Sequence, residues 1–264
     1  MVKKKKYGIA LISIIPIRKE PSDASEMTSQ MLFGEVYEIM ETTPDWYKIV
    51  NLYDNDSGWM DKKMFTGIDQ EDFANNSSAY ILTSPYAQIE SVSDHVKQNI
   101  VAGSVLFNFN ESKKAFSIST HKYKIISQLK PSEISDNIRE NILHTTQIYM
   151  HAPYLWGGKT PFGIDCSGFT QMVYKINSLI LPRNAQQQYE VIKDDVSLIN
   201  ALPGSLAFFS KGDKKVSHVG ILIGNTQIIH ASGHVRVDFI DRKGIYNNEL
   251  KKHTHFLLAI KNSL

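Results

Sequence analysis

The sequence predicts an α+β fold in which two small β-barrels precede a mixed domain of helices and an antiparallel sheet. Short runs of β-forming residues, separated by Pro, Gly, Asn and Asp, fill residues 7–128 and are typical of small barrels. A helical repeat of apolar residues begins near residue 134, and two strand-like runs with histidines follow it. We therefore predict domains at residues 1–72, 73–130 and 131–264.

The N-terminal apolar run YGIALISIIPI, residues 7–17, has two interpretations. Its basic start resembles a secretory signal peptide. However, the run is short and β-branched, lacks a small-residue cleavage site and passes directly into Arg18 and Lys19, so we favour the first strand of a barrel. On this basis we expect a cytoplasmic protein, with a periplasmic or secreted location as the alternative.

Two short segments suggest that the barrels are related, and a third marks where they end. FGEVYEI at 33–39 and AGSVLFN at 102–108 share a Gly-x-Val core. Pro131 and Ser132 then supply a breaker and a possible N-cap for a helix. We place the boundary of the C-terminal domain there.

The composition of the chain bears on which classes of binding partner the protein can have. The chain of 264 residues has 29 Lys and Arg against 27 Asp and Glu, a formal charge of +2, which gives no electrostatic reason to expect nucleic acid. No segment approaches the roughly 18 apolar residues of a membrane span. One cysteine allows no intramolecular disulfide. We expect a monomer that needs no cofactor or metal ion.

The single cysteine, Cys166, lies in the stretch TPFGIDCSGFTQ. A loop rich in Gly precedes it, and Phe169, Met172 and Val173 then mark one face of a helix. Cys166 therefore falls in the first turn, where free N–H groups and the helix dipole favour a thiolate nucleophile. The alternative is a buried cysteine that acts as a small hydrophobe.

Two histidines can serve as the proton acceptor that a thiol nucleophile needs. His218 and His230 lie in strand-like runs separated by GNT, a hairpin signal. With a three-residue loop, Ile223 pairs with Gln227 and Gly220 pairs with His230. The two histidines then lie diagonally on one face of the hairpin, within side-chain reach.

The neighbours of Cys166 suit a substrate-binding role. Gly163 and Gly168 would let the backbone approach a ligand closely. The Cys166 backbone N–H would donate to an oxyanion. Asp165 and Ser167 offer one acceptor and one donor for a polar substrate.

The ordered motifs YLWGG, P.G.DCSGF, LPRNAQQQ, HVGILIG and IIHASG resemble those of the NlpC-type cysteine peptidases. These are papain-like enzymes that cut bacterial cell-wall peptides, and the resemblance covers about residues 140–263. The N-terminal half resembles the SH3-like modules that precede such domains. SEMTSQMLFGE before a GW turn is similar to members that act as γ-D-glutamyl-L-diamino-acid endopeptidases, or dipeptidyl-peptidases VI.

The resemblance implies a papain-like catalytic domain behind two SH3-like barrels, and it implies a role for each of seven residues. It also implies hydrolysis of the γ-D-glutamyl-diamino-acid bond in short muropeptides with a free N-terminal L-Ala, as in murein recycling. The implied roles are nucleophile for Cys166, general base for His218, orienting residue for His230, oxyanion donor for Tyr154, and binding of the substrate amine and backbone for Asp165, Ser167 and Glu35.

Four alternatives stay open at this point. The enzyme could be an exported hydrolase of intact stem peptides, or a papain-like acyltransferase, since water and another nucleophile attack the same acyl-enzyme. Cys166, His218 and His230 could instead hold zinc, although a structural zinc site normally has four ligands. Finally, the barrels could bind cell wall beside an inert catalytic half.

Overall fold

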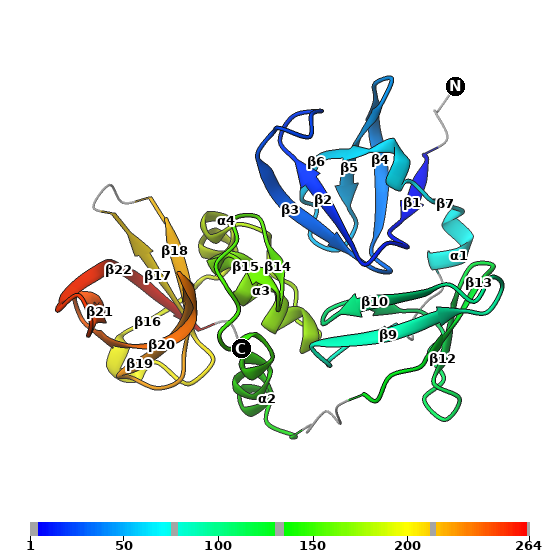
Figure 1. Ribbon diagram of the computed structural model, residues 1–264. Helices are drawn as coiled ribbons and strands as arrows, with labels where there is room; N and C mark the ends of the chain where they lie inside the picture. Colours follow the sequence, from blue (N-terminus) through cyan, green and yellow to red (C-terminus); the bar gives the residue numbers. More distant parts are fainter. Residues whose placement is uncertain (1–4, 75–78, 130–134, 212–214, 263–264) are drawn as a thin grey trace. The chain divides into compact units, whose positions relative to one another are not determined.

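The computed structural model describes residues 5–74, 79–129, 135–211 and 215–262. They fall into two compact units, Met1–Ser132 and Glu133–Leu264 (Figure 1). The predicted domain boundary between residues 130 and 131, with the expected breaker Pro131 and cap Ser132, lies outside the described residues. The predicted α+β class is confirmed, because strands make up the first unit and helices join a sheet in the second.

The first barrel is a seven-stranded antiparallel sheet in the order β3-β2-β6-β5-β4-β1-β7. The apolar run 7–17, predicted as one strand, forms two strands that pair with different neighbours: β1 with β4 and β7, and β2 with β3 and β6. The bend between them lets one segment serve both ends of the sheet. The strands are β1 (Tyr7–Ile9), β2 (Ile14–Arg18), β3 (Met27–Leu32), β4 (Val36–Thr42), β5 (Trp46–Asn51), β6 (Ser57–Asp61) and β7 (Gly67–Ile68), with a 3-10 turn at Lys62–Met64.

The second barrel follows the short helix α1 (Gln70–Ala74) and consists of a four-stranded sheet, in the order β10-β9-β13-β12, and a pair of strands, β11 and β8. Its strands are β8 (Tyr80–Ile81), β9 (Tyr86–Ser91), β10 (Lys97–Val101), β11 (Val105–Leu106), β12 (Ala115–Ile118) and β13 (His121–Ile125).

The two Gly-x-Val segments occupy equivalent turns. Gly34 has φ +84° and Gly103 has φ +86°, values that favour glycine. In the first turn the Glu35 N–H donates to the Leu32 carbonyl. In the second turn the Ser104 N–H donates to the Val101 carbonyl in the same way. A Cβ on Gly34 would lie 1.9 Å from the Val105 carbonyl oxygen, so this turn of the first barrel packs directly on the second.

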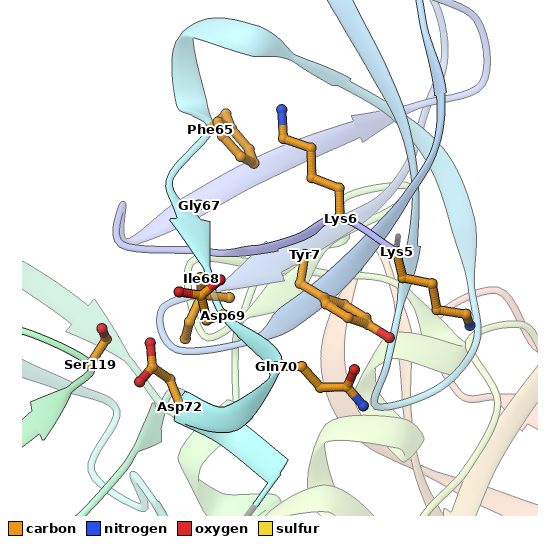
Figure 2. A pocket seen from close by; sticks show the side chains of 10 residues that line it. All are labelled: Lys5, Lys6, Tyr7, Phe65, Gly67, Ile68, Asp69, Gln70, Asp72 and Ser119. Carbon is orange, nitrogen blue, oxygen red and sulfur yellow. The ribbon is translucent and has the colours of Figure 1, made fainter. Parts of the chain in front are cut away.

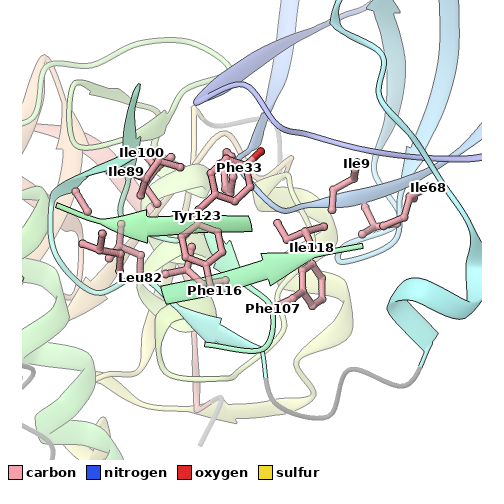
Figure 3. Packing of buried hydrophobic residues seen from close by; sticks show 14 residues of the cluster. Ile9, Phe33, Ile68, Leu82, Ile89, Ile100, Phe107, Phe116, Ile118 and Tyr123 are labelled. Atoms are coloured by element: carbon pink, nitrogen blue, oxygen red, sulfur yellow. The ribbon is translucent and has the colours of Figure 1, made fainter. Parts of the chain in front are cut away.

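The barrels share one hydrophobic core (Figure 3). Phe33, from the first barrel, is fully buried and meets Phe116 and Tyr123 of the second edge-on, with ring centroids 5.9 and 5.4 Å apart. The first barrel has a further core of its own around Met31 and Tyr37. The regions 1–72 and 73–130 are therefore joined by apolar packing, in addition to the chain that connects them.

The second unit begins with helices. These are α2 (Ile138–Thr146), which continues as a 3-10 turn at Gln147–Tyr149, α3 (Cys166–Ile176) and α4 (Ala185–Val191). Asn137 caps α2 by accepting from the Arg139 N–H. Of the helices in the described part of the chain, the longest has 11 residues, and none is long and apolar enough to cross a membrane.

A six-stranded barrel closes the second unit. The sheet order is β16-β22-β17-β18-β19-β20-β21, and a further pairing of β21 with β22 closes it, so the predicted antiparallel sheet forms a barrel. Helix α3 contacts β18 and β19. The strands are β14 (Lys159–Thr160) and β15 (Gly163–Ile164), which form a separate hairpin, and β16 (Asp194–Val196), β17 (Leu206–Ser210), β18 (His218–Leu222), β19 (Gln227–Ser232), β20 (His234–Asp241), β21 (Gly244–Asn247) and β22 (Lys252–Asn262), with a 3-10 turn at Leu198–Asn200.

Candidate active site

Cys166 is the first residue of α3, as the sequence predicts, and Asp165 is the residue that caps the helix. The Asp165 carboxylate accepts from the Gly168 N–H at 2.7 Å, the usual N-cap interaction. Residues 166–175 of α3 are all buried, because the helix packs against α2 and α4 as well as against the barrel. A fixed helix start therefore holds the thiol in place.

The thiol of Cys166 is uncharged at neutral pH. Burial, followed by the negative charge of Asp165, raises its pKa to about 12. Hydrogen bonds from the backbone of Val219 and Ser167 act in the opposite direction and are outweighed. Backbone donors at the helix start favour the thiolate, but the cost of burying the charge is larger.

The hairpin that carries the two histidines has the predicted register. The Ile223 N–H donates to the Gln227 carbonyl, and Ile221 pairs with Ile229, which places Gly220 opposite His230. His218 Nε2 and His230 Nδ1 lie 2.8 Å apart. A Cβ on Gly220 would lie 2.8 Å from the Cβ of His230, so only glycine allows this close approach.

Both histidines are buried and uncharged. Burial lowers the pKa of His218 well below its usual value, and the nearby imidazoles of His230 and His255, which would repel a protonated ring, add to this. Burial also lowers the pKa of His230, against the opposing effect of Asp238. The Val219 N–H, next in the chain to His218, bonds to the Cys166 sulfur. The thiol therefore lies against the strand that carries His218, and both the thiol and the imidazole are neutral.

Sequence reasoning missed three residues around the histidine pair. The ring of His255, on β22, stacks over that of His218 with centroids 4.2 Å apart. Asp238, on β20, accepts from His230 at 3.0 Å, and Arg236 donates to the same carboxylate oxygen at 2.9 Å. The turn at Gly233 that aligns β20 with β19 was the signal that could have revealed Asp238 and Arg236.

Asp165 and Ser167 form a buried polar cluster with Arg183, which sequence reasoning also missed. Arg183 binds both carboxylate oxygens of Asp165, at 2.6 and 3.0 Å, and the Ser167 hydroxyl at 3.1 Å. The Gly157 N–H donates to Asp165 as well, at 2.8 Å. The charge of Asp165 is thus already balanced by a cation of the chain itself.

Residues 151–255 match the NlpC/P60 family, and residues 17–64 match the bacterial dipeptidyl-peptidase SH3 domain. The chain carries an NlpC/P60 domain. It is 27% identical to the dipeptidyl-peptidase 6 of Lysinibacillus sphaericus, over 92% of this chain and 95% of the relative. It is 25% identical to the γ-D-glutamyl-L-lysine dipeptidyl-peptidase of Bacillus subtilis, over 77% of this chain and 71% of the relative. The protein is a cysteine peptidase.

The fold also matches solved structures. The crystal structure of an NlpC/P60 family protein from Bacillus cereus superimposes with a TM-score of 0.80 at 18% identity, covering 98% of this chain and 99% of the other. An NlpC/P60 endopeptidase from Photobacterium damselae gives 0.70 at 15% identity, over 96% and 72%. At such identities the likeness shows the fold: an NlpC/P60 domain behind an SH3-like, β-rich region.

The glycines around Cys166 have an internal role in the NlpC/P60 domain. A Cβ on Gly168 would lie 2.3 Å from the carbonyl oxygen of Gly158, and one on Gly163 would lie 2.8 Å from the side chain of Leu155. The expectation that Gly163 and Gly168 leave room for a substrate is therefore not supported, because the chain itself fills that space.

The structure places Tyr154 within the site and describes Glu35 only in the first unit. Burial raises the pKa of Tyr154, and the charges of Cys166 and Asp165 act in the same direction, so its hydroxyl lies near the thiol. Glu35 is buried and accepts from the Leu32 N–H at 2.9 Å. Burial raises the pKa of Tyr53, and the charge of Glu35 adds to this, so these two side chains are neighbours.

The geometry around the histidines of the NlpC/P60 domain argues against zinc. His218 Nε2 and His230 Nδ1 are bonded to each other, and His230 Nε2 is bonded to Asp238. Both ring nitrogens of His230 are thus occupied. Among the described residues, no group of three or more His, Cys, Asp or Glu is arranged to hold a metal.

A cavity of about 580 Å³ lies in the first unit (Figure 2). Lys5, Lys6, Asp69 and Asp72 supply its charged groups. All four are exposed to solvent. Cys166, His218 and His230 are by contrast buried in the NlpC/P60 domain.

Proposed function

We propose that this cysteine peptidase cleaves the bond between γ-D-glutamate and the following diamino acid in short peptidoglycan peptides with a free N-terminal L-Ala. The observation that carries the proposal is the array of Cys166, His218 and His230 in one buried site, joined to a domain of the dipeptidyl-peptidase SH3 type. The names of relatives that match over most of their length support the choice of bond.

In the first step, Cys166 is the nucleophile and His218 is the base. The sulfur attacks the γ-carbonyl carbon of D-glutamate while the thiol proton passes to the free ring nitrogen of His218, Nδ1. Because both groups start neutral, proton transfer accompanies attack. The Cys166 N–H and the Tyr154 hydroxyl are the donors we assign to the oxyanion.

In the second step, the tetrahedral intermediate collapses. The carbon–nitrogen bond breaks, and His218 returns its proton to the departing amine of the diamino acid. Water then attacks the thioester with His218 again as base, which releases L-Ala-γ-D-Glu and restores the thiol. His230 orients His218 through their hydrogen bond of 2.8 Å.

Recognition of the free amine is assigned to Asp165 and Ser167, which lie at the start of α3. Arg183 already balances Asp165, so a blocked amine would leave no unpaired charge at that residue. The remaining effect is the loss of hydrogen bonds between charged groups, worth about 1.5–3 kcal/mol. This corresponds to a decrease of roughly tenfold to a hundredfold in kcat/KM.

The test compares free L-Ala-γ-D-Glu-diamino-acid tripeptide with its N-acetyl form, by chromatography of the products. We expect kcat/KM for the acetylated peptide to be lower by about tenfold to a hundredfold. The Cys166→Ala variant serves as the control for contaminating peptidases. Equal values for both peptides would shift the function to hydrolysis of intact stem peptides. A product joined to an added amine would indicate an acyltransferase.

The proposal includes a cytoplasmic site of action, where short peptides are recycled. Fractionation of the cells, followed by N-terminal sequencing of the mature protein, tests it. A processed N-terminus in the external fraction would contradict recycling and favour wall cleavage.

A further inference from the structure

A chain of hydrogen bonds continues beyond the histidine pair. His218 Nε2 and His230 Nδ1 lie 2.8 Å apart, and His230 Nε2 lies 3.0 Å from Asp238 Oδ2. Arg236 Nε donates to the same oxygen at 2.9 Å. In the pairing of β19 with β20, His230 lies opposite Arg236 and Ile228 lies opposite Asp238. Arg236 and Asp238 therefore lie on the face of the sheet that carries His230.

The ionised carboxylate of Asp238 determines which ring nitrogen of each histidine carries the proton. Its ionised carboxylate can only accept hydrogen bonds, so His230 must carry its proton on Nε2. A neutral imidazole has one N–H, and His230 Nδ1 is then an acceptor. His218 must therefore donate from Nε2, which leaves Nδ1 of His218 as the only nitrogen able to accept the proton of Cys166. The opposite tautomer of His230 would turn a lone pair toward the carboxylate.

We propose that Asp238 is a positioning residue that fixes the tautomers of both histidines, with Arg236 holding its carboxylate in place. This inference rests on the proposed roles of Cys166 and His218. Asp238 touches neither the substrate nor the reacting sulfur. Its contribution is to keep the free nitrogen of His218 at Nδ1 before attack and to oppose the positive charge that His218 gains during attack.

The exposure of Asp238 and Arg236, at the outer end of this series of hydrogen bonds, suits a positioning role. Asp238 is 13% exposed and Arg236 23% exposed, while His230 is fully buried. Of the two hydrogen-bond partners of His230, His218 is buried, and Asp238 is the one nearer to solvent. Its pKa lies below the usual value, through hydrogen bonds and charge interactions with His230 and Arg236 that outweigh burial.

The decisive measurement is the nitrogen-15 NMR spectrum of histidine-labelled, full-length protein at neutral pH. In the wild type we expect Nε2–H tautomers for both His218 and His230. Arg236 and His230 share one oxygen of Asp238, so the variant must remove that acceptor: in Asp238→Leu, of similar shape, no carboxylate holds the proton of His230 on Nε2, and an Nδ1–H signal should appear. His218 should follow, and kcat should fall about tenfold to a hundredfold, with KM within about twofold. Asp238→Glu, which keeps a carboxylate, should recover part of kcat and the wild-type tautomers.

Asp241→Asn is the matched control, because Asp241 lies on the same strand and its carboxylate binds His253 at 3.0 Å. We expect it to leave kcat and the tautomers of His218 and His230 unchanged. An Nδ1–H signal for His230 in the wild type would overturn the inference, as would an unchanged tautomer and kcat in Asp238→Leu. The tautomers are read without substrate. A wild type with the expected tautomers and no turnover would therefore overturn the proposed function and leave this inference standing.

Discussion

At the scale of single residues, Cys166 and His218 form a neutral pair. Burial raises the pKa of the thiol to about 12 and lowers that of the imidazole. Both shifts oppose the transfer of a proton before substrate arrives, since an ion pair in a buried site costs desolvation energy. The oxyanion donors and the substrate carbonyl must therefore supply part of the stabilisation during attack.

Replacement of Cys166 by Ala or Ser should abolish turnover while substrate binding survives. Loss of the thiol removes covalent catalysis, and the remaining donors give only residual acceleration. Product chromatography measures turnover, and calorimetric titration with the tripeptide measures binding. More than a few per cent of activity in the Ala variant would refute the assignment of Cys166 as nucleophile.

His255 should make the catalytic unit less stable in acid. Burial lowers its pKa to about 4, with the charges of His230 and Arg236 adding to the effect. Between pH 6.5 and about 4 the unfolded chain therefore binds a proton that the folded chain does not. The free energy of unfolding should fall as pH falls through this range, by at most about 2 kcal/mol, since His255 is partly exposed.

Calorimetry at pH 7 and pH 5 measures this effect. His255→Phe keeps a ring over His218 and should reduce the decrease in Tm between the two pH values. The exposed His121 of the second barrel provides the control His121→Phe, which should retain the wild-type decrease. An unchanged pH dependence in His255→Phe would show that other groups cause it.

At the scale of elements, the hairpin of β18 and β19 sets the distance between the two histidines. Gly220→Ala would add a methyl group 2.8 Å from both His230 Cβ and Ile228 Cδ1. The strands must then separate, and displacements of about 1 Å in an active site can cost about a hundredfold in rate. We expect kcat to fall tenfold or more in the product assay.

Gly224 lies in the turn of the same hairpin, and an added Cβ there meets no atom within 4 Å. Gly224→Ala is therefore the matched control and should keep wild-type kcat. Equal activity of the two variants would mean that the hairpin tolerates separation at Gly220.

The pairing of the strands also explains which features of the fold and of the site could be predicted from the sequence. The hairpin register was predictable because the loop length fixes which residues pair. Asp238 and Arg183 were missed because each reaches the site through a neighbouring strand or loop whose pairing the local pattern does not specify. Strand β3, MTSQML, was missed because polar residues hide its alternation. The raised pKa of Cys166 could not be predicted because burial depends on the packing of the whole unit.

At the scale of the whole molecule, the shared core makes the first unit one folding unit. Phe33 belongs to the first barrel and packs among aromatic rings of the second. Phe33→Ala should cost about 3–5 kcal/mol and lower the unfolding temperature of both barrels together. Calorimetry of the full chain measures this, with Met40→Ala, at a side chain that is 55% exposed, as the control. Two barrel transitions, of which only one shifts, would contradict a shared core.

The burial of Cys166 also governs its behaviour toward oxidants. Burial raises the pKa of the Cys166 thiol to about 12, so at pH 7 only a very small fraction of the molecules carries a thiolate. Peroxide and alkylating reagents react with the thiolate. We therefore expect the free enzyme to resist sulfenic acid formation through the same burial that holds the sulfur beside Val219, and the sulfur to become reactive when it attacks a bound peptide while His218 takes up its proton.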